Sequence, residues 1–388
     1  MVRVVALDIG SGFTKCVSCD QRIIFPSLYS YRQAGLWEDR DDTVEAVGEQ
    51  ALVIAQHPNA VTLYPVIDGK PQHEAFIKLA EEAPRRLNIH FFEEICLVTG
   101  LPYETGKQDR EQIKNQLKDK LRLNHLAVYP QAVGTLFDID LQSATVINIG
   151  HGTTEIAVIE KLNMLGGMSE PLASDYVLTS LSNFIQSKHG FKPTTDSLIA
   201  LVSGKTDCIT AFGKSPVNRK DLDIQLQSTA DHLVEKISYN TRYLLAQLPS
   251  NLECMKAIVL SGGGSLMGGL HEMVEQQLAC TVLTPADPIF SNVQGFYKRG
   301  GSSTARIKTV TKISVKLTKE LAEKLDGWKS YGFRPSDSVR LALSLLPNSP
   351  EEMRNGHIPN LRIRPLRDSV LQVQSEDEMA ALKTMQEW

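Results

Sequence analysis

Apolar residues within residues 1–297 gather in short blocks that end at glycine-rich turns. The chain opens with the apolar block Val2–Ile9, followed by a turn with Gly10 and Gly12 and then by a second block. The same order recurs from Ala144 onward, where ATVINI precedes another glycine turn. Short apolar runs bounded by turn residues are typical of buried strands. We therefore predict two strand hairpins about 140 residues apart, which indicates an internal duplication.

A third glycine cluster lies between an apolar block and a helical pattern. In KAIVLSGGGSLMGGLHEMVEQQL the block ends at Gly262, Gly263 and Gly264, and an amphipathic helix follows. Three segments before this cluster have apolar residues at helical spacing, namely SDYVLTSLSNFIQSKHG, TTDSLIALVSG and STADHLVEKISYNTRYLLAQL. Strand and helix patterns mixed in this way predict an α/β fold.

After residue 298 the pattern changes. GSSTARIK is rich in small polar residues, which predicts a linker at 299–310. In Thr311–Leu317 (TKISVKL) apolar and polar residues alternate, which predicts a strand. LTKELAEKLDGWKSYG and FRPSDSVRLALSLL, which follow, are typical of helices. Because a strand and two helices within 311–346 cannot bury the strand's apolar face, we expect two copies to pair through their strands.

Composition narrows the class of protein. The chain of 388 residues is 42% hydrophobic and exceeds the usual size of a single core, so we expect two or three domains. It has no apolar run of about 18 residues and no signal-peptide pattern, so we expect a cytoplasmic protein with no membrane partner. The six cysteines are scattered, and no second pair completes a zinc site with Cys16 and Cys19, so we expect core or surface thiols.

The charges are distributed unevenly. Residues 298–346 hold 11 Lys and Arg against 4 Asp and Glu, a net charge of +7, and residues 347–388 have a net charge of −2. Since the whole chain carries −4, residues 1–297 carry −9. This asymmetry indicates a basic module joined to an acidic body.

The first glycine turn has the residue types of a phosphate site. Gly10 and Gly12 permit positive φ angles and let a phosphate approach the turn amides. Asp8, at the end of the preceding strand, can hold a magnesium ion through water, and Lys15 can reach a phosphate oxygen. For this turn taken alone, an ordinary hairpin with a surface lysine stays the alternative.

Taken in order, the three glycine signals resemble those of the superfamily of actin, sugar kinases and heat-shock chaperone ATPases. LDIGSGFTK resembles the first phosphate loop, VINIGHGTTEI the second, and VLSGGGSLMGG the adenosine loop. VYPQAVGTL (Val128–Leu136) resembles the helix that connects the two halves. VTGLPYE, FPS and VGEQAL are most similar to the plasmid-segregating actin-like ATPases of the ParM type. This resemblance implies the actin-like, ribonuclease H-like duplicated ATPase fold over about residues 1–297.

The resemblance also implies domain boundaries. The first half is 1–140, with a small lobe within about 25–64, and the second half is 141–298, with a small lobe within about 176–250. The implied enzyme is an ATPase that binds ATP or GTP together with Mg²⁺.

The family's functional positions map onto this chain. Gln131 matches the position that orients the attacking water in actin, so the resemblance implies Gln131 and Asp8 as catalytic residues and Asp8 as the metal ligand. The residues implied in nucleotide binding are Gly10, Ser11, Gly12, Phe13, Lys15, Asn148, Gly150, His151, Gly152, Thr153, Gly262, Gly263, Gly264 and Met267.

The second loop departs from the family pattern. Asn148 stands where the family has an aspartate, and His151 stands where actin has another acid. An amide can hydrogen-bond a water ligand of a metal but carries no charge to attract it. We therefore expect slow hydrolysis, with Asp8 as the main carboxylate that organises the metal.

The C-terminal pattern resembles the ribbon-helix-helix domains, including those of the ParR-type segregation adaptors. In that family a two-stranded ribbon from two copies enters the DNA major groove. The resemblance implies a small β-α-α domain at 311–346 that contacts DNA through Thr311, Lys312, Ser314, Lys316, Arg334 and Ser336. The alternative is a solvated edge strand whose lysines oppose aggregation. The tail, 347–388, ends in a short helical pattern that would either dock on the actin-like body or pack on its own domain.

Together these resemblances predict an ATP-dependent, filament-forming actin-like protein that segregates plasmid DNA. It would associate with itself in filaments and as a ribbon-helix-helix dimer, and would bind double-stranded DNA at centromere-like repeats. The main alternative is a nucleotide-sensing transcriptional regulator that does not polymerise, and a third is a structural scaffold that has lost hydrolysis.

Overall fold

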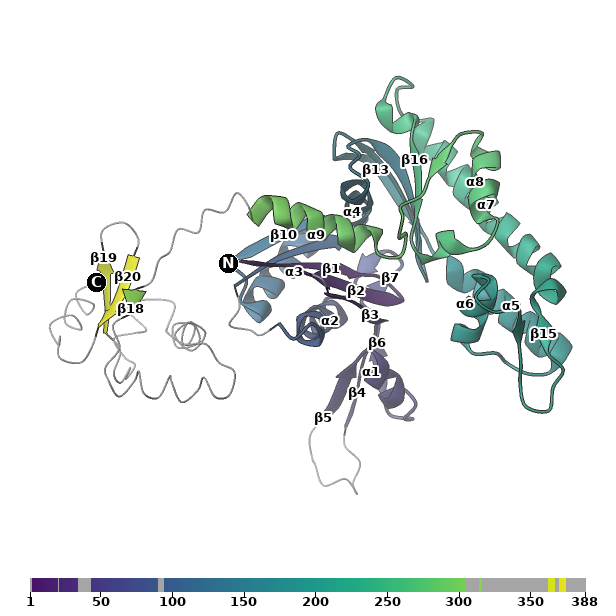
Figure 1. Ribbon diagram of the computed structural model, residues 1–388, viewed down its shortest axis with the longest axis horizontal. Helices are drawn as coiled ribbons and strands as arrows, with labels where there is room; N and C mark the ends of the chain where they lie inside the picture. The colour runs from purple at the N-terminus through teal and green to yellow at the C-terminus, as the bar shows by residue number, and fades with distance from the viewer. Residues whose placement is uncertain are drawn as a thin grey trace. The chain divides into compact units, whose positions relative to one another are not determined.

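The computed structural model describes residues 2–19, 21–33, 43–89, 94–304, 314–315, 362–366 and 370–374 (Figure 1). The chain divides into two units. The body is formed by Arg3–Ile89 and Ile95–Ser303, and the second unit by Met1–Val2, His90–Glu94 and Thr304–Trp388.

The first half of the body is built on a five-stranded sheet in the order β10-β9-β1-β2-β3. Its strands are β1 (Arg3–Ile9), β2 (Phe13–Ser18), β3 (Gln21–Pro26), β9 (Ile95–Leu101) and β10 (His125–Pro130). The first three strands are antiparallel, and β9 and β10 are parallel to β1. The helices α2 (His73–Arg86) and α3 (Lys107–Leu121) supply the side chains of the core beneath this sheet, among them Phe76, Leu79, Ile113 and Leu117.

A small lobe follows β3. It consists of a three-stranded sheet, β5-β4-β6, with one short helix, and a separate two-stranded sheet follows it. The bounds are β4 (Tyr29–Gln33), β5 (Thr43–Val47), α1 (Glu49–Ile54), β6 (Val61–Leu63), β7 (Val66–Ile67) and β8 (Lys70–Pro71). β4, β5 and β6 lie between residues 25 and 64, and the predicted bounds of a small lobe there stay a prediction.

The second half is built on a sheet in the order β13-β12-β11-β16-β17. Its strands are β11 (Ala144–Ile149), β12 (Thr154–Glu160), β13 (Asn163–Glu170), β16 (Ile258–Ser261) and β17 (Val282–Leu283). Its remaining elements are α5 (Ser174–His189), α6 (Thr195–Val202), β14 (Cys208–Ile209), β15 (Val217–Asn218), η1 (Arg219–Leu222), α7 (Asp223–Leu245), η2 (Glu253–Met255), η3 (Gly263–Leu266) and α8 (Leu270–Leu278).

The two sheets have the same topology, as the predicted internal duplication requires. In each, three antiparallel strands are followed by two parallel ones. The turns after β1 and β11 are also closed by equivalent hydrogen bonds. Gly10 N donates to Phe13 O at 3.1 Å, and Gly150 N donates to Thr153 O at 2.9 Å.

Two helices, α4 (Gln131–Asp138) and α9 (Ser291–Thr304), cross where both have a glycine. A Cβ atom at Gly295 would overlap the carbonyl oxygen of Gly134. The hydroxyl of Thr135 donates to Asn292 Oδ1 at 2.7 Å at the same crossing. Because α4 contacts strands of both sheets, this crossing lies at the connection between the halves.

The observed elements correct several predicted boundaries. Residues 299–304, predicted as the start of a linker, are the last turns of α9, and residues 305–310 lie outside the described part. Val128–Pro130, predicted as helix, belong to β10, because a proline disfavours helical backbone angles in the residue before it and Pro130 itself is extended, with a ψ of 138°. Among the helices that the structure describes, none is long and apolar enough to cross a membrane.

In the second unit the structure describes a three-stranded sheet in the order β18-β20-β19. β18 (Ser314–Val315) lies within the predicted strand Thr311–Leu317 and pairs in parallel with β20 (Val370–Gln374) of the same chain. β20 pairs antiparallel with β19 (Arg362–Leu366). The two predicted helices of the ribbon-helix-helix domain lie outside the described residues.

Candidate functional site

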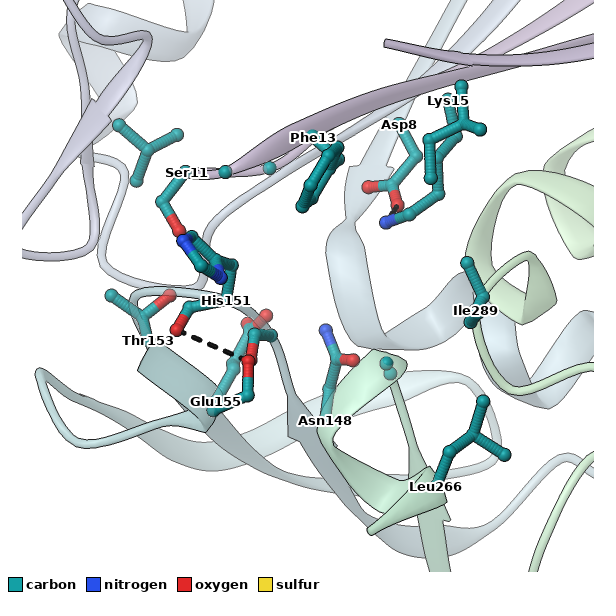
Figure 2. A pocket seen from close by; sticks show the side chains of 18 of the residues that line it. Asp8, Ser11, Phe13, Lys15, Asn148, His151, Thr153, Glu155, Leu266 and Ile289 are labelled. Carbon is teal, nitrogen blue, oxygen red and sulfur yellow. Dashed lines mark hydrogen bonds and ion pairs between the residues drawn. The ribbon is translucent and has the colours of Figure 1, made fainter. Parts of the chain in front are cut away.

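A cleft of about 290 Å³ lies in the body where the two glycine turns face each other (Figure 2). Most residues proposed for nucleotide binding or catalysis line it: Asp8, Gly10, Ser11, Gly12, Phe13, Lys15, Gln131, Asn148, Gly150, His151, Thr153, Gly262, Gly263 and Met267. Gly152 and Gly264 are not among its lining residues. Of the proposed DNA contacts, Ser314 lies in β18, and Thr311, Lys312, Lys316, Arg334 and Ser336 lie outside the described residues.

Strand register places equivalent pairs of residues on the two sides of the cleft. In the first hairpin Asp8 lies opposite Lys15, and in the second Asn148 lies opposite Glu155. The hairpin of the first half therefore pairs an acid with a base, and the equivalent hairpin of the second half pairs an amide with an acid.

Asp8 is the centre of a buried polar network. Asp8 is 1% exposed to solvent. Its Oδ2 accepts a hydrogen bond from Lys15 Nζ at 3.0 Å, and its Oδ1 accepts one from the side-chain amide of Gln131. Charge-assisted bonds of this kind offset the cost of burying a carboxylate. The network brings the end of β1, the start of β2 and the start of α4 to one point at the floor of the cleft.

The two turns touch each other. Gly152 N donates to Ser11 Oγ at 3.2 Å, which explains why Gly152 lies at the contact rather than along the cleft. The rings of Phe13 and His151 meet edge to face with centroids 5.7 Å apart. A Cβ atom at Gly12 would lie 2.5 Å from that of His151, so only glycine leaves room for the imidazole there.

The second turn is also fastened to the N-terminus of α5. Ser174 Oγ donates to Gly150 O at 2.8 Å, and Asp175 N donates to His151 O at 2.8 Å. These bonds use two carbonyl groups of the turn, so its amide groups keep their direction. Amides at a helix N-terminus and in a glycine turn together attract anions.

The third glycine cluster is shaped by close packing against the second turn. Gly262 has a φ of +84°, and a side chain at Gly264 would overlap Ile149. Gly264 therefore packs beneath the cleft, whereas Gly263 and Met267 line it. This end of the cleft has the apolar side chains of Leu266 and Ile289 (Figure 2), and Leu178, Ile199, Val202 and Met267 are further apolar residues of the cleft lining.

Glu155 is a cleft residue that the sequence interpretation missed. It is 5% exposed and accepts a hydrogen bond from Tyr103 N, in the first half, at 3.0 Å. Burial raises the pKa of Glu155 to about 7; the bond from Tyr103 opposes the rise, and the charge of Asp8 adds to it. The duplication itself carried the signal, because DIGSGFTK and NIGHGTTE align residue by residue and place Glu155 at the position of Lys15.

Mg²⁺ fits this donor set through Asp8. Magnesium sites that hold nucleotide phosphates use one or two carboxylates together with waters. Asp8 supplies one carboxylate, and the Asn148 side-chain oxygen is directed at Ser261 Oγ, 3.5 Å away. Within the described residues no cluster of three or more His, Cys, Asp and Glu side chains forms a metal site of its own.

Comparisons with known proteins agree with this architecture. Residues 6–139 match the family model of the actin-like proteins N terminal domain. The cell shape-determining protein Mbl of Bacillus subtilis (strain 168) is 23% identical over 275 residues, with 63% of this chain and 81% of Mbl covered.

Solved structures show the same fold. MreB 5 of Spiroplasma citri bound to AMPPNP superposes with a TM-score of 0.63 at 16% identity, covering 79% of this chain and 98% of MreB 5. The ADP-bound form gives 0.63 at 15% identity, with 80% and 99% covered. The MamK double helical filament gives 0.61 at 18% identity, with 78% and 99% covered. The body of this chain therefore has the actin-like fold, and its first half matches the N-terminal domain of the actin-like proteins.

Proposed function

We propose that this chain is an ATP-dependent, filament-forming actin-like protein that segregates plasmid DNA. The observation that carries the nucleotide part is the pair of equivalent glycine turns that face each other across the Asp8–Lys15–Gln131 network. A nucleoside triphosphate would place its base at the apolar end of the cleft and its phosphates between the turns. MreB 5, which shares this fold, has been solved with AMPPNP and with ADP.

The network has a direct chemical use. A phosphate oxygen between the turns competes with Asp8 for Lys15 Nζ, and the release of Lys15 leaves Asp8 Oδ2 free to accept from the water shell of a cation. Bound Mg²⁺ would neutralise part of the phosphate charge. Gln131, held by Asp8 at the floor of the cleft, would orient the attacking water, a role that depends on position rather than on acidity.

Filament formation is supported by the fold's relatives, since MamK was solved as a double helical filament. A head-to-tail contact that does not close into a ring gives an open filament. The DNA part of the proposal rests on the sequence: the net charge of +7 in residues 298–346 and the strand-helix-helix pattern of 311–346. Plasmid segregation and the ParM-like and ParR-like roles belong to the proposal alone.

Electron microscopy and sedimentation of the full chain test the proposal. Polymer should form with Mg²⁺ and ATP, and should be absent without nucleotide. Asp8→Ala should lose turnover by about a hundredfold or more, because the variant loses the anchor of both Lys15 and Gln131. Asp207→Ala, an exposed acid outside the cleft, is the matched control. ATP binding without polymer, combined with ATP-dependent DNA binding, would contradict the filament and favour a non-polymerising regulator.

A further inference from the structure

We propose that the exposed side of α7 pairs with the same side of α7 in a second copy of this chain, antiparallel and about a two-fold axis. The inference goes beyond the proposed function, because it requires neither a nucleotide nor the basic segment. It rests on the order of charged and apolar residues along one side of the helix.

One side of α7 packs into the body, and the opposite side is exposed to solvent. Leu233 and Ile237 belong to the core of the second half. On the opposite side Ile224 is 88% exposed, and farther along the helix Tyr239 and Tyr243 are 64% and 55% exposed. Because an α-helix has about 3.6 residues per turn, these three residues follow the same side of α7.

The two ends of this exposed side have opposite character. The first end carries a hollow lined by Asp223, Ile224, Gln227, Ser228 and Asp231. The second end carries the cation of Lys236 and the rings of Tyr239 and Tyr243. An acidic hollow at one end and aromatic rings with a base at the other complement each other when one copy is reversed.

A two-fold axis at the middle of α7, between positions 233 and 234, matches the charges of two copies. Each residue then faces the residue that lies equally far from the axis in the second copy. Asp231 faces Lys236, and His232 faces Glu235, and all four are exposed. Because the contact is symmetric, each of these pairs occurs twice.

The same axis brings the tyrosines to the hollow. Ser228 faces Tyr239 of the second copy, and Ile224 faces Tyr243 of the second copy, so both rings meet the residues that line the hollow. Tyrosine suits such a contact, because its ring buries a large apolar area while its hydroxyl can stay hydrated. Charged and apolar positions therefore agree on one register.

The charged groups of this side are available for such a contact. Lys236 Nζ lies 3.8 Å from Glu170 Oε1, which is beyond hydrogen-bond distance. Asp231 Oδ1 accepts one hydrogen bond, from Gln227 Nε2 at 3.0 Å, and a carboxylate can accept several. Both groups can thus pair with a second copy and keep these contacts. The contact closes on itself, so it makes a dimer, unlike the head-to-tail contact of a filament.

Analytical ultracentrifugation of the full chain, over a range of concentrations and without nucleotide or DNA, tests this inference. Wild type should associate reversibly. Asp231→Lys and Lys236→Asp should each raise the dissociation constant by about tenfold or more, because symmetry replaces two ion pairs by two contacts of like charge. An equimolar mixture of the two variants should regain association, because each variant then meets the opposite charge on the other.

Ile224→Arg should also weaken association by about tenfold, because it puts a cation where the register brings Tyr243 of the second copy. Phe212→Arg and Asp207→Lys are matched controls, at exposed positions outside α7, and should associate as wild type does. Pairing through residues 298–388 would be equal in all samples, because no substitution lies there.

The inference is overturned if wild type associates no more tightly than Ile224→Arg, or if the mixture of the two charge variants does not regain association. Unfolding curves show whether each variant is folded, and if a charge variant is not, the comparison of Ile224→Arg with Phe212→Arg decides. Since no nucleotide is present, a negative result leaves the proposed function untouched.

Discussion

At the scale of single residues, the site depends on contacts that join distant parts of the sequence. Asp8 and Lys15 could be proposed from the sequence, because both flank one glycine turn. The bond from Gln131 to Asp8 spans 123 positions and depends on how α4 meets the first sheet. No local pattern contains that information, so the sequence supplied Gln131 only through a family resemblance.

Gln131→Ala should slow hydrolysis by on the order of a hundredfold and leave ATP affinity nearly unchanged, because orienting a water matters mainly in the transition state. Phosphate release under saturating ATP measures the hydrolysis rate, and calorimetric titration measures the ATP affinity. Gln108→Ala, on an exposed position of α3, is a suitable control. A large loss of affinity with normal turnover per bound ATP would show that Gln131 has a different role.

Glu155 should make the stability of the nucleotide-free protein depend on pH. Its pKa is about 7 in the folded chain against an ordinary 4.5, so the folded state binds its proton more tightly than the unfolded state does. Stability should therefore fall as pH rises from about 4.5 through 7, by on the order of 3 kcal/mol from this group.

Glu155→Gln removes that titration and keeps an oxygen for the amide of Tyr103. The variant should be more stable than wild type at pH 8, and the difference should shrink towards pH 5 in urea unfolding experiments. A difference that is constant between pH 5 and pH 8 would show that Glu155 does not titrate in this range.

At the scale of secondary-structure elements, glycine turns and amphipathic helices could be predicted from the sequence. The predicted ends of the helices were less accurate. α7 begins at Asp223, five residues before the predicted Ser228, because η1 leads directly into it. α9 continues to Thr304 through Gly300 and Gly301, residues of low helix propensity. Gly300 packs closely against Val4 and Val98, and this tertiary packing keeps these residues helical in spite of their low propensity.

The crossing of α4 and α9 gives a direct test of this packing. Gly295→Ala would force a methyl group into the Gly134 carbonyl oxygen, so the helices must separate, and we expect a loss of about 2 kcal/mol or more. Gly301→Ala, in the same helix, adds a Cβ that would meet nothing within 4 Å, and should be neutral or stabilising by about 0.5–1 kcal/mol. Urea unfolding measures both changes. Equal stability of the two variants would show that the two helices pack less closely at Gly295 than the structure indicates.

At the scale of the whole molecule, the sequence predicted a duplicated body followed by a separate module. The two sheets of the body confirm the duplication. The last stretch of the body ends at Ser303, and the predicted domain boundary at 298 stays a prediction. The net charge changes sign along the sequence, with −9 in residues 1–297 and +7 in residues 298–346, of which 298–303 still belong to the body. An acidic body opposes non-specific contact with DNA, so any DNA affinity should come from the basic segment.

If the basic segment binds DNA and the body forms filaments, the two activities should be coupled. A filament presents many basic segments in a row, so a DNA fragment with tandem sites should bind much more tightly than one with a single site, through effective concentration. ATP should strengthen binding to the tandem fragment and hardly change binding to the single site. Anisotropy titrations of both fragments, with and without ATP, measure this coupling. Lys312→Ala and Lys316→Ala should each lower the slope of log affinity against log salt by about 0.9 if the lysine contacts a phosphate. Equal affinity in all four conditions would mean that the segment binds DNA without any link to assembly, and would remove segregation from the proposed function.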